Sequence, residues 1–285
     1  MAREAGHEVV ALDCELADKD GLRQQVLAAA PDSVVHLAAI SFVGQADENA
    51  FYAVNVVGTM NLLDALLALP KLPQRVLLAS SANVYGNCDA SPIDEKQLPA
   101  PMNHYATSKL AMEHMARTVG DRLPLVFTRP FNYTGVGQAG QFLIPKLVSH
   151  FARRAAAIEL GNLHVEREFN DVSLVCAAYL QLIEHGIAGE TYNICSGNAY
   201  ALQQVIELLT GITGHRMDVT VNRTFVRAGE VHRLCGNPAR LKALPPPAIS
   251  LPAPLSLEQT LRRMLLVAEQ ELQRRATDEQ DVTHR

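Results

Sequence analysis

The segment HYATSK, residues 104–109, places a tyrosine and a lysine four positions apart. Residues at this spacing lie one turn apart on the same face of an α-helix, so Tyr105 and Lys109 would point in one direction. A phenol has a pKa of about 10, and a neighbouring ammonium lowers it by stabilising the phenolate. The pair is therefore either a device for moving a proton to or from an oxygen, or the start of an ordinary surface helix.

Ser81 is a third residue whose type and place suit this chemistry. The run QRVLLASSANVYG (74–86) predicts a strand followed by an irregular turn, which puts Ser81 just beyond the strand. Its hydroxyl could hold a substrate oxygen while Tyr105 moves the proton and a nicotinamide exchanges hydride. Because serines are common in turns, the surrounding elements must decide between the two interpretations.

Predicted strands and helices alternate around these candidates. Strands are expected at 7–13, 31–39 and the start of 123–135, and helices at 53–69 and 104–119. This alternation predicts an α/β fold with a Rossmann-like, doubly wound parallel sheet. Ligands bind beyond the carboxyl ends of such strands. The expected strand ends carry Asp13, His36 to Ala39, Ser80, Ser81 and Arg129 to Asn132.

The lengths of the predicted elements and loops divide the chain into three parts. Residues 1–135 predict a dinucleotide-binding domain that is incomplete at its N-terminus. Residues 136–275 predict mainly a small α/β substrate-binding lobe, with segments that return to the first domain. Residues 276–285, TDEQDVTHR and the residue before it, predict a flexible tail.

Composition narrows the class of protein. The 285 residues are 48% hydrophobic and 19% charged, with a net charge of −5, which disfavours nucleic acid and anionic membranes as partners. No apolar run is long enough to predict a membrane span, and Met1 leads directly into AREAGHE without a signal peptide. The five cysteines form no CxxC pair and the histidines have no metal-ligand spacing, so we expect reduced thiols, no metal and a cytoplasmic location.

Several longer motifs, in a fixed order, carry a family resemblance. The chain resembles the extended short-chain dehydrogenases/reductases, the NAD-dependent epimerase/dehydratase family, and within it the GDP-4-keto-6-deoxy-D-mannose reductases. The resemblance runs over HLAA (36–39), NVVGTMNLLDA (55–65), SSANVYG (80–86), YATSKLAME (105–113), RPFNYTGVGQ (129–138), REFNDV (167–172), YNICSG (192–197) and RAGEVHRLCGNPARL (227–241).

The resemblance implies a role for each matching residue. Ser81, Tyr105 and Lys109 match the catalytic trio, with Ser81 preferred to Ser80 because the family's hydroxyl lies five residues before Gly86. Tyr105 and Lys109 also match cofactor-binding positions, together with Leu37, Ala38, Ala39, Asn55 and Phe131. Positions that hold the nucleotide-sugar correspond to Ser41, Asn83, Asn132, Arg167, Arg227 and Glu230. Arginines can grip a diphosphate, and a carboxylate can accept from ribose hydroxyls.

The expected cofactor is NAD or NADP, with NAD slightly favoured. Asp13 ends the first predicted strand, where a carboxylate would bind the adenine ribose hydroxyls and repel a 2′-phosphate. The alternative for Asp13 is an ordinary turn residue.

One local difference separates the chemistries of the family. Its 4,6-dehydratases carry a carboxylate just after the catalytic hydroxyl, whereas this chain has Ala82 and Asn83 after Ser81. Alanine and asparagine cannot move the proton that dehydration requires, so we do not expect dehydration. The resemblance implies reduction of the 4-keto group of a nucleotide-linked 4-keto-6-deoxy-hexose, with GDP favoured as the nucleotide, or alternatively 4-epimerisation with NAD. The resemblance also implies a homodimer that pairs through the helices at 53–69 and 104–119.

The family opens with a strand, a Gly-rich turn and a helix, and the sequence contains no GxxGxxG anywhere. The glycines of that turn let the backbone approach the cofactor pyrophosphate. We expect either a start assigned too far downstream or a real loss of this segment. The second case would allow another class of function, a non-catalytic protein that binds sugar nucleotides.

Overall fold

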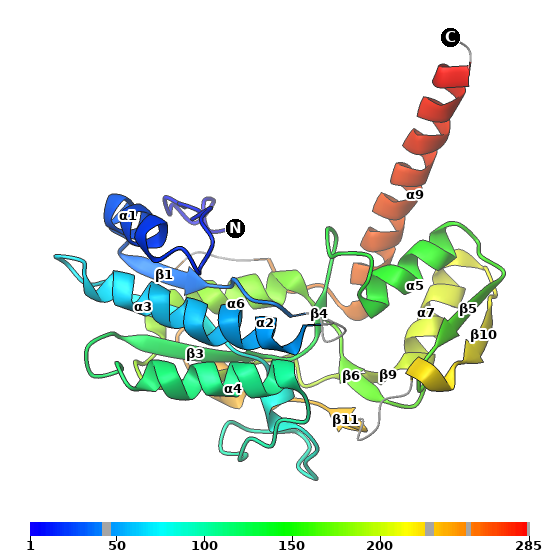
Figure 1. Cartoon of the computed structure of the whole chain (residues 1–285). Coiled ribbons are helices and arrows are strands. Elements are labelled where there is room, and N and C mark those ends of the chain that lie inside the picture. The colour runs from blue at the N-terminus through cyan, green and yellow to red at the C-terminus, as the bar shows by residue number, and fades with distance from the viewer. Residues whose placement is uncertain (42–46, 226–230, 249–251, 284–285) are drawn as a thin grey trace. The chain divides into compact units, whose positions relative to one another are not determined.

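The computed structural model describes residues 1–41, 47–225, 231–248 and 252–283 (Figure 1). The chain forms two compact units. The first contains Met1–Phe131, Val175–Gly197 and Gly236–Pro252, and the second contains Asn132–Leu174, Asn198–Cys235 and Ala253–Arg285.

A four-stranded parallel sheet forms the centre of the first unit. The strands are β1 (Ser33–His36), β2 (Arg75–Ala79), β3 (Leu125–Pro130) and β8 (Thr191–Ile194), in the spatial order β1-β2-β3-β8. All three pairings are parallel, so the carboxyl ends of the strands share one edge. The Rossmann-like parallel sheet predicted from the sequence is confirmed.

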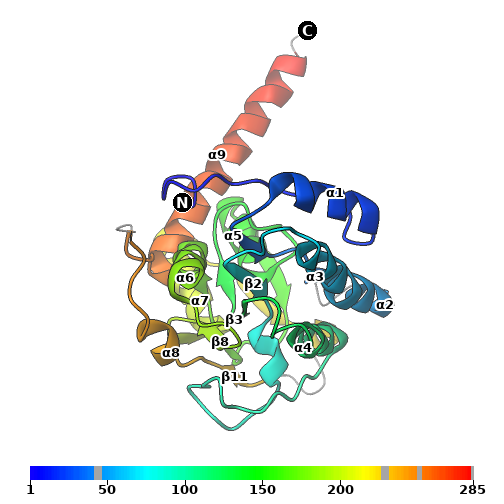
Figure 2. The ribbon, with the colours of Figure 1, turned by 90° about the vertical axis from the view of Figure 1, so that its left-hand side faces the viewer.

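Helices cover both faces of this sheet (Figure 2). On one side lie α1 (Lys19–Ala29), α3 (Thr59–Leu67) and α4 (His104–Arg117), and on the other lies α6 (Val172–His185). Alternate strand residues face the two sides, as the two-residue period of a strand requires. The side of α1, α3 and α4 encloses a core that includes Leu22, Val26, Leu62, Leu63, Leu66, Val76, Leu78, Met112, Leu125 and Phe127.

The strand predicted at residues 7–13 is wrong. Residues 7–12 have no regular secondary structure, and Val9 and Val10 are 42% and 58% exposed. A strand exists only through hydrogen bonds to a neighbouring strand. Within the described residues β1 pairs with β2 alone, so the segment 7–12 has no strand beside it.

One continuous helical stretch precedes β2. It contains α2 (Glu48–Tyr52), the π-helical segment η1 (Ala53–Gly58) and α3. By length and composition this stretch, Glu48–Leu67, could cross a membrane, with a mean hydropathy of 1.4, contrary to the sequence-based expectation that no run is long enough. Half of it is buried, and its apolar side chains pack into the core of the first unit.

The second unit is built from short strands and three longer helices. The strand pairs are β5 (Ala157–Leu160) with β10 (Asp218–Val221), and β4 (Tyr133–Thr134) with β7 (Asn170–Asp171). A third sheet joins β6 (Glu166–Glu168) to β9 (Ala199–Ala201) and β11 (Arg233–Leu234). The helices α5 (Leu143–Ala152), α7 (Leu202–Thr213) and α9 (Leu257–Thr283) enclose its core. Short elements complete the chain: η2 (Ala82–Tyr85), α8 (Ala239–Lys242) and η3 (Arg223–Phe225).

Helix α9 is longer than the sequence predicts. We expected a helix to about residue 275 and a flexible tail at 276–285, but α9 continues to Thr283. The residues after 275 contain no glycine or proline, the two residues that most strongly stop a helix.

Gly86 provides a test of the turn that follows the predicted catalytic serine. Its φ is +60°, and a Cβ atom there would lie 1.8 Å from the Ala100 carbonyl oxygen. Gly86→Ala should lower the free energy of unfolding by about 2 kcal/mol or more, through backbone strain and a clash with backbone.

The matched control is Gly137→Ala. Gly137 also has a positive φ, +87°, but a Cβ there meets nothing within 4 Å. Urea unfolding should show a loss of about 1 kcal/mol in the control. Equal losses in the two variants would contradict the role of the Ala100 contact.

Candidate active site

Tyr105 and Lys109 lie in the first two turns of α4. The Asn103 side chain caps this helix by accepting a hydrogen bond from the Ala106 N–H at 2.9 Å, which explains why α4 begins at His104. Tyr105 is 8% exposed and its ring centroid lies 6.1 Å from that of Phe51. The two candidates therefore share one helix face, as their spacing predicts, and that face is turned into the unit.

The Lys109 ammonium is buried at the carboxyl end of β2. Its Nζ donates to the carbonyl oxygen of Ala79 at 2.5 Å, and the residue is 4% exposed. Burial lowers the pKa of Lys109 to about 8, against the opposing effect of the Glu113 carboxylate. A cation beside Tyr105 stabilises the phenolate, which is the condition that proton transfer at neutral pH requires.

Ser81 stands two residues beyond Ala79 and begins η2. Its Oγ accepts from the Asn83 N–H at 3.2 Å, and the residue is 7% exposed. A hydroxyl that accepts a backbone hydrogen bond can still donate its own proton to an incoming oxygen. Because η2 packs against α4, the turn brings Ser81 to the same end of the unit as Tyr105 and Lys109.

Asn55 ties the segment after β1 to the catalytic helix. Its amide accepts from the Ile40 N–H at 2.9 Å, donates to the Ile40 carbonyl at 3.1 Å, and donates to Ser108 Oγ at 3.0 Å. Ser108 in turn donates to the Tyr105 carbonyl at 2.8 Å. Asn55, a predicted cofactor-binding residue, thus ties Ile40, which follows Ala38 and Ala39, to α4.

The sequence around His36, at the end of β1, does not by itself indicate a chemical role. Its Nε2 lies 2.9 Å from Thr59 Oγ1, and Thr59 donates to the Asn55 carbonyl at 2.8 Å. Burial, followed by the charge of Lys109, lowers the pKa of His36 to about 4. His36 is therefore an uncharged core residue at neutral pH.

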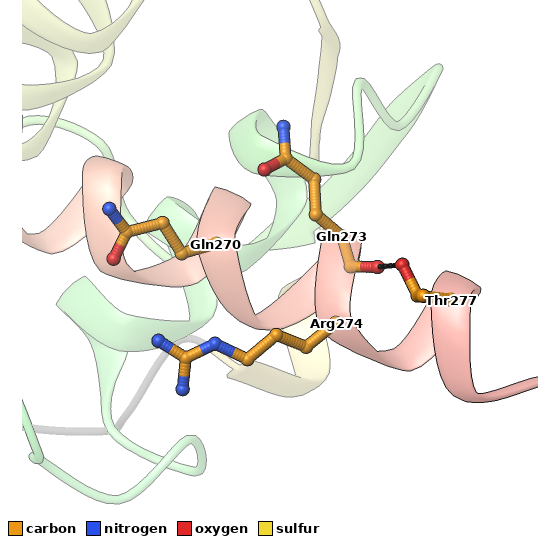
Figure 3. Close-up of a pocket in the computed structure, with 4 residues that line it drawn as sticks. All are labelled: Gln270, Gln273, Arg274 and Thr277. Atoms are coloured by element: carbon orange, nitrogen blue, oxygen red, sulfur yellow. Dashed lines mark hydrogen bonds between the residues drawn. The ribbon is translucent and has the colours of Figure 1, made fainter.

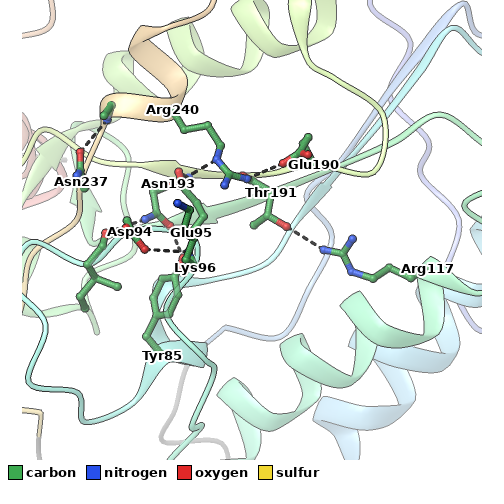
Figure 4. A network of polar contacts seen from close by, with 12 residues as sticks. Tyr85, Asp94, Glu95, Lys96, Arg117, Glu190, Thr191, Asn193, Asn237 and Arg240 are labelled. Carbon is green, nitrogen blue, oxygen red and sulfur yellow. Dashed lines mark hydrogen bonds and ion pairs between the residues drawn. The ribbon is translucent and has the colours of Figure 1, made fainter.

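A polar network closes the β8 edge of the sheet (Figure 4). The buried Tyr85 hydroxyl donates to Asn193 Oδ1 at 2.7 Å, and Glu95 accepts the Asn193 backbone N–H at 2.8 Å. Arg240 of α8 lies 3.6 Å from Glu95 and donates to Glu190 at 2.6 Å. Tyr85 and Asn193 belong to the SSANVYG and YNICSG segments, but nothing in the two segments indicates that these residues bond to each other.

The remaining predicted cofactor residues differ in their surroundings. Asp13 accepts from Gln25 of α1 at 2.6 Å, and its N–H donates to Gln25 Oε1 at 3.1 Å. Leu37 and Ala38 are exposed and Ala39 is half-buried. Phe131 is 1% exposed, and its ring packs against Tyr85 at 6.3 Å between centroids, so its side chain belongs to the core.

The predicted substrate residues fall in both units. In the first, Ser41 is exposed and Asn83 is half-buried. In the second, the Asn132 carbonyl accepts from the Asn170 N–H at 3.0 Å, and the Arg167 guanidinium donates to the carbonyls of Glu166, Val231 and His232. Arg227 and Glu230 lie outside the described residues.

A hollow beside α9 does not resemble a catalytic site. Its lining, Gln270, Gln273, Arg274 and Thr277, comes from this one helix, and Thr277 Oγ1 donates to the Gln273 carbonyl one turn earlier (Figure 3). The hollow includes none of the residues that the sequence singles out.

Comparison with known proteins identifies the protein family to which the chain belongs. The model of the family described as GDP-mannose 4,6 dehydratase matches residues 2–244, and the chain belongs to this family, which lies among the epimerase/dehydratase-type short-chain dehydrogenases/reductases.

Two relatives narrow the comparison. The chain is 39% identical to the GDP-6-deoxy-D-talose 4-dehydrogenase of Aggregatibacter actinomycetemcomitans, over 74% of this chain and 72% of that one. It is 38% identical to the GDP-6-deoxy-D-mannose reductase of Pseudomonas aeruginosa, over 74% and 73%. The solved structure of RMD from Pseudomonas aeruginosa complexed with NADPH matches with a TM-score of 0.84 at 33% identity, covering 95% of this chain and 94% of that one.

The buried histidine predicts a pH dependence of stability. Because the pKa of His36 falls to about 4 in the fold from an unfolded value of 6.5, the unfolded state binds the extra proton first as the pH drops. The contribution is fully present above pH 6.5 and is lost between pH 6.5 and 4, by up to about 3 kcal/mol.

Urea unfolding between pH 7.5 and 4 measures this loss. His36→Gln should show a shallower decline than the wild type over that window, and His114→Gln, at an exposed position of α4, should follow the wild type. A His36→Gln profile parallel to the wild type would contradict the assignment.

Proposed function

We propose that this protein reduces the 4-keto group of a GDP-linked 4-keto-6-deoxy-hexose with NAD(P)H. The observation that carries the proposal is the buried Tyr105–Lys109 pair at the carboxyl ends of the strands, with the Ser81 hydroxyl on the adjoining turn. The names of the two relatives agree with this choice, because both act on GDP-linked 6-deoxy sugars. Talose and mannose differ in configuration at C4, which is the carbon that such a reduction would change.

Each side chain has a separate task in this reaction. Tyr105 donates a proton to the C4 oxygen, and Lys109 supplies the positive charge that makes the phenol a usable acid. Ser81 donates a hydrogen bond to the same oxygen and fixes its direction. Ala82 and Asn83 carry no carboxylate next to Ser81, so we do not propose elimination of water by this chain.

The residues around Lys109 suit a nicotinamide nucleotide. Lys109 offers a buried ammonium to ribose hydroxyls, and the small side chains of Ala38 and Ala39 would let the cofactor lie against a backbone that Asn55 holds in place. When bound, the cofactor supplies the hydride. Although Asp13 does not end a strand, its carboxylate would favour NAD by accepting from the adenine ribose hydroxyls, and a hydrogen bond from Gln25 orients it.

Turnover tests the proposal. The protein should oxidise NADPH or NADH in proportion to the GDP-4-keto-6-deoxy-mannose consumed. Tyr105→Phe should lower kcat by about 10²- to 10⁴-fold, because the proton donor is lost, while isothermal titration shows unchanged binding of the GDP-sugar.

Tyr52→Phe is the matched control. It also removes a tyrosine hydroxyl, one that is hydrogen-bonded to His104, the first residue of α4. A fully active Tyr105→Phe would refute the mechanism. Interconversion of sugar nucleotides without net NADPH oxidation would point to a 4-epimerase instead. Binding of the sugar nucleotide without dinucleotide binding would point to a non-catalytic protein.

We also propose that two copies pair through η1, α3 and α4. Val57 on η1 and Met115 on α4 are 54% and 45% exposed, and these two segments pack against each other. Large apolar side chains on adjoining helices favour association.

Val57→Asp combined with Met115→Glu should convert a dimer to a monomer in sedimentation velocity. Leu98→Glu, at a loop position 79% exposed, is the control and should leave the dimer intact. A wild-type protein that sediments as a monomer at all concentrations would refute the pairing.

A further inference from the structure

Helix α4 carries a third polar residue on the face of Tyr105 and Lys109. Glu113 lies one turn beyond Lys109, and it is 2% exposed. The positions 105, 109 and 113 follow each other at intervals of four, so one buried stripe holds a phenol, an ammonium and a carboxylate. A buried carboxylate is unfavourable unless a positive group with good hydrogen-bond geometry compensates it.

Arg129 of β3 supplies that compensation. Its Nε donates to Glu113 Oε1 at 2.9 Å and its Nη2 donates to Oε2 at 2.7 Å, which is the two-pronged geometry of a strong ion pair. The guanidinium also lies over the Tyr85 ring, 4.8 Å from the centroid. Burial opposes the charge of Arg129, but the hydrogen bonds and charge of Glu113 outweigh burial and raise the pKa of Arg129.

The two hydrogen bonds from Arg129 determine where the Glu113 carboxylate points. At a four-residue spacing on one helix, a carboxylate and an ammonium can pair directly. Among the described residues Glu113 is instead paired with Arg129, and Lys109 Nζ donates to the Ala79 carbonyl. The negative charge of Glu113 therefore raises the pKa of Lys109, although the two side chains do not form an ion pair with each other.

Other groups around Lys109 do not replace this charge. Tyr105 precedes it on α4, and His36 faces it from β1 but is uncharged at neutral pH. Arg117, one turn beyond Glu113, and Arg129 from β3 are both positive. Among the residues that the structure describes, Glu113 is thus the carboxylate whose negative charge raises the pKa of Lys109.

We propose that Glu113 and Arg129 are positioning residues: Arg129 holds the Glu113 carboxylate one turn away from Lys109, which keeps the Lys109 ammonium charged yet available to Tyr105 and the bound ligand. The catalytic purpose of this pair rests on the proposed function, whereas its effect on the Lys109 pKa is a property of the folded chain. Two substitutions should therefore move Lys109 in opposite directions.

Glu113→Gln removes the negative charge and leaves Arg129 uncompensated, so the Lys109 pKa should fall. Arg129→Gln releases Glu113 to pair with Lys109, so the Lys109 pKa should rise. The double variant leaves no unpaired charge and should fold more readily than either single variant. Its Lys109 pKa should fall as in Glu113→Gln, because the Glu113 carboxylate that acts on Lys109 is absent from both variants.

NMR titration of protein labelled at the lysine side chains, without ligand, measures this effect. The Lys109 signal is assigned by its loss in Lys109→Met. Glu258→Gln is the control, since Glu258 and Arg262 form an exposed ion pair at the same four-residue spacing on α9. It should leave the Lys109 titration unchanged.

Activity gives a second readout. With Glu113→Gln, kcat/KM at pH 8 should fall by about fivefold for a one-unit drop in the Lys109 pKa, because fewer molecules carry the ammonium. With Arg129→Gln, kcat/KM should fall although the ammonium persists to higher pH.

A purely structural pair would give a different result. Shifts of the same sign in both single variants, or no shift in either, would overturn the proposal. If the single variants do not fold, a double variant with the wild-type Lys109 titration would overturn it. Opposite shifts in a chain without turnover would instead refute the proposed function and leave this inference standing.

Discussion

The buried ammonium of Lys109 is the constraint on which the first unit depends. Its pKa of about 8, against 10.5 for an exposed lysine, means that the charged form is less stable in the fold. Because the unfolded chain binds the proton more tightly, stability should rise with pH between 8 and 10.5, and the charge costs about 3 kcal/mol at neutral pH. The Ala79 carbonyl, which accepts from Nζ, and the Glu113 carboxylate, which Arg129 holds in place, limit this cost.

The sheet is what brings these groups together. Parallel pairing places the ends of β1, β2 and β3 at one edge, and α4 packs against β3, η1 and η2 with its polar stripe buried. Asn55 fixes the chain after β1, while Ser81 caps the turn after β2. The catalytic candidates need little freedom of their own, since backbone and neighbouring side chains already set their directions.

Local patterns predicted those parts of the molecule that depend on local interactions. The helix that begins at residue 104 and carries Tyr105 and Lys109 on one face was predicted from its periodicity, and the parallel sheet from the alternation of strands and helices along the chain. The strand at 7–13 failed because pairing is not a local property, and α9 exceeded its predicted end because nothing in the sequence stops it. The Glu113–Arg129 ion pair joins a helix residue to a strand residue, so local patterns do not predict it. The four-residue step from Lys109 to Glu113 was the signal that could have suggested it.

We propose that this arrangement of side chains reduces the carbonyl at C4 of a GDP-linked sugar. The most direct measurement is the fate of deuterium from the reactive C4 position of labelled NADPH or NADH, followed by NMR of the isolated sugar product. We expect one deuterium at C4 of the sugar, in a single configuration, for each cofactor oxidised. A product without deuterium at C4, formed while both ligands are bound, would contradict it.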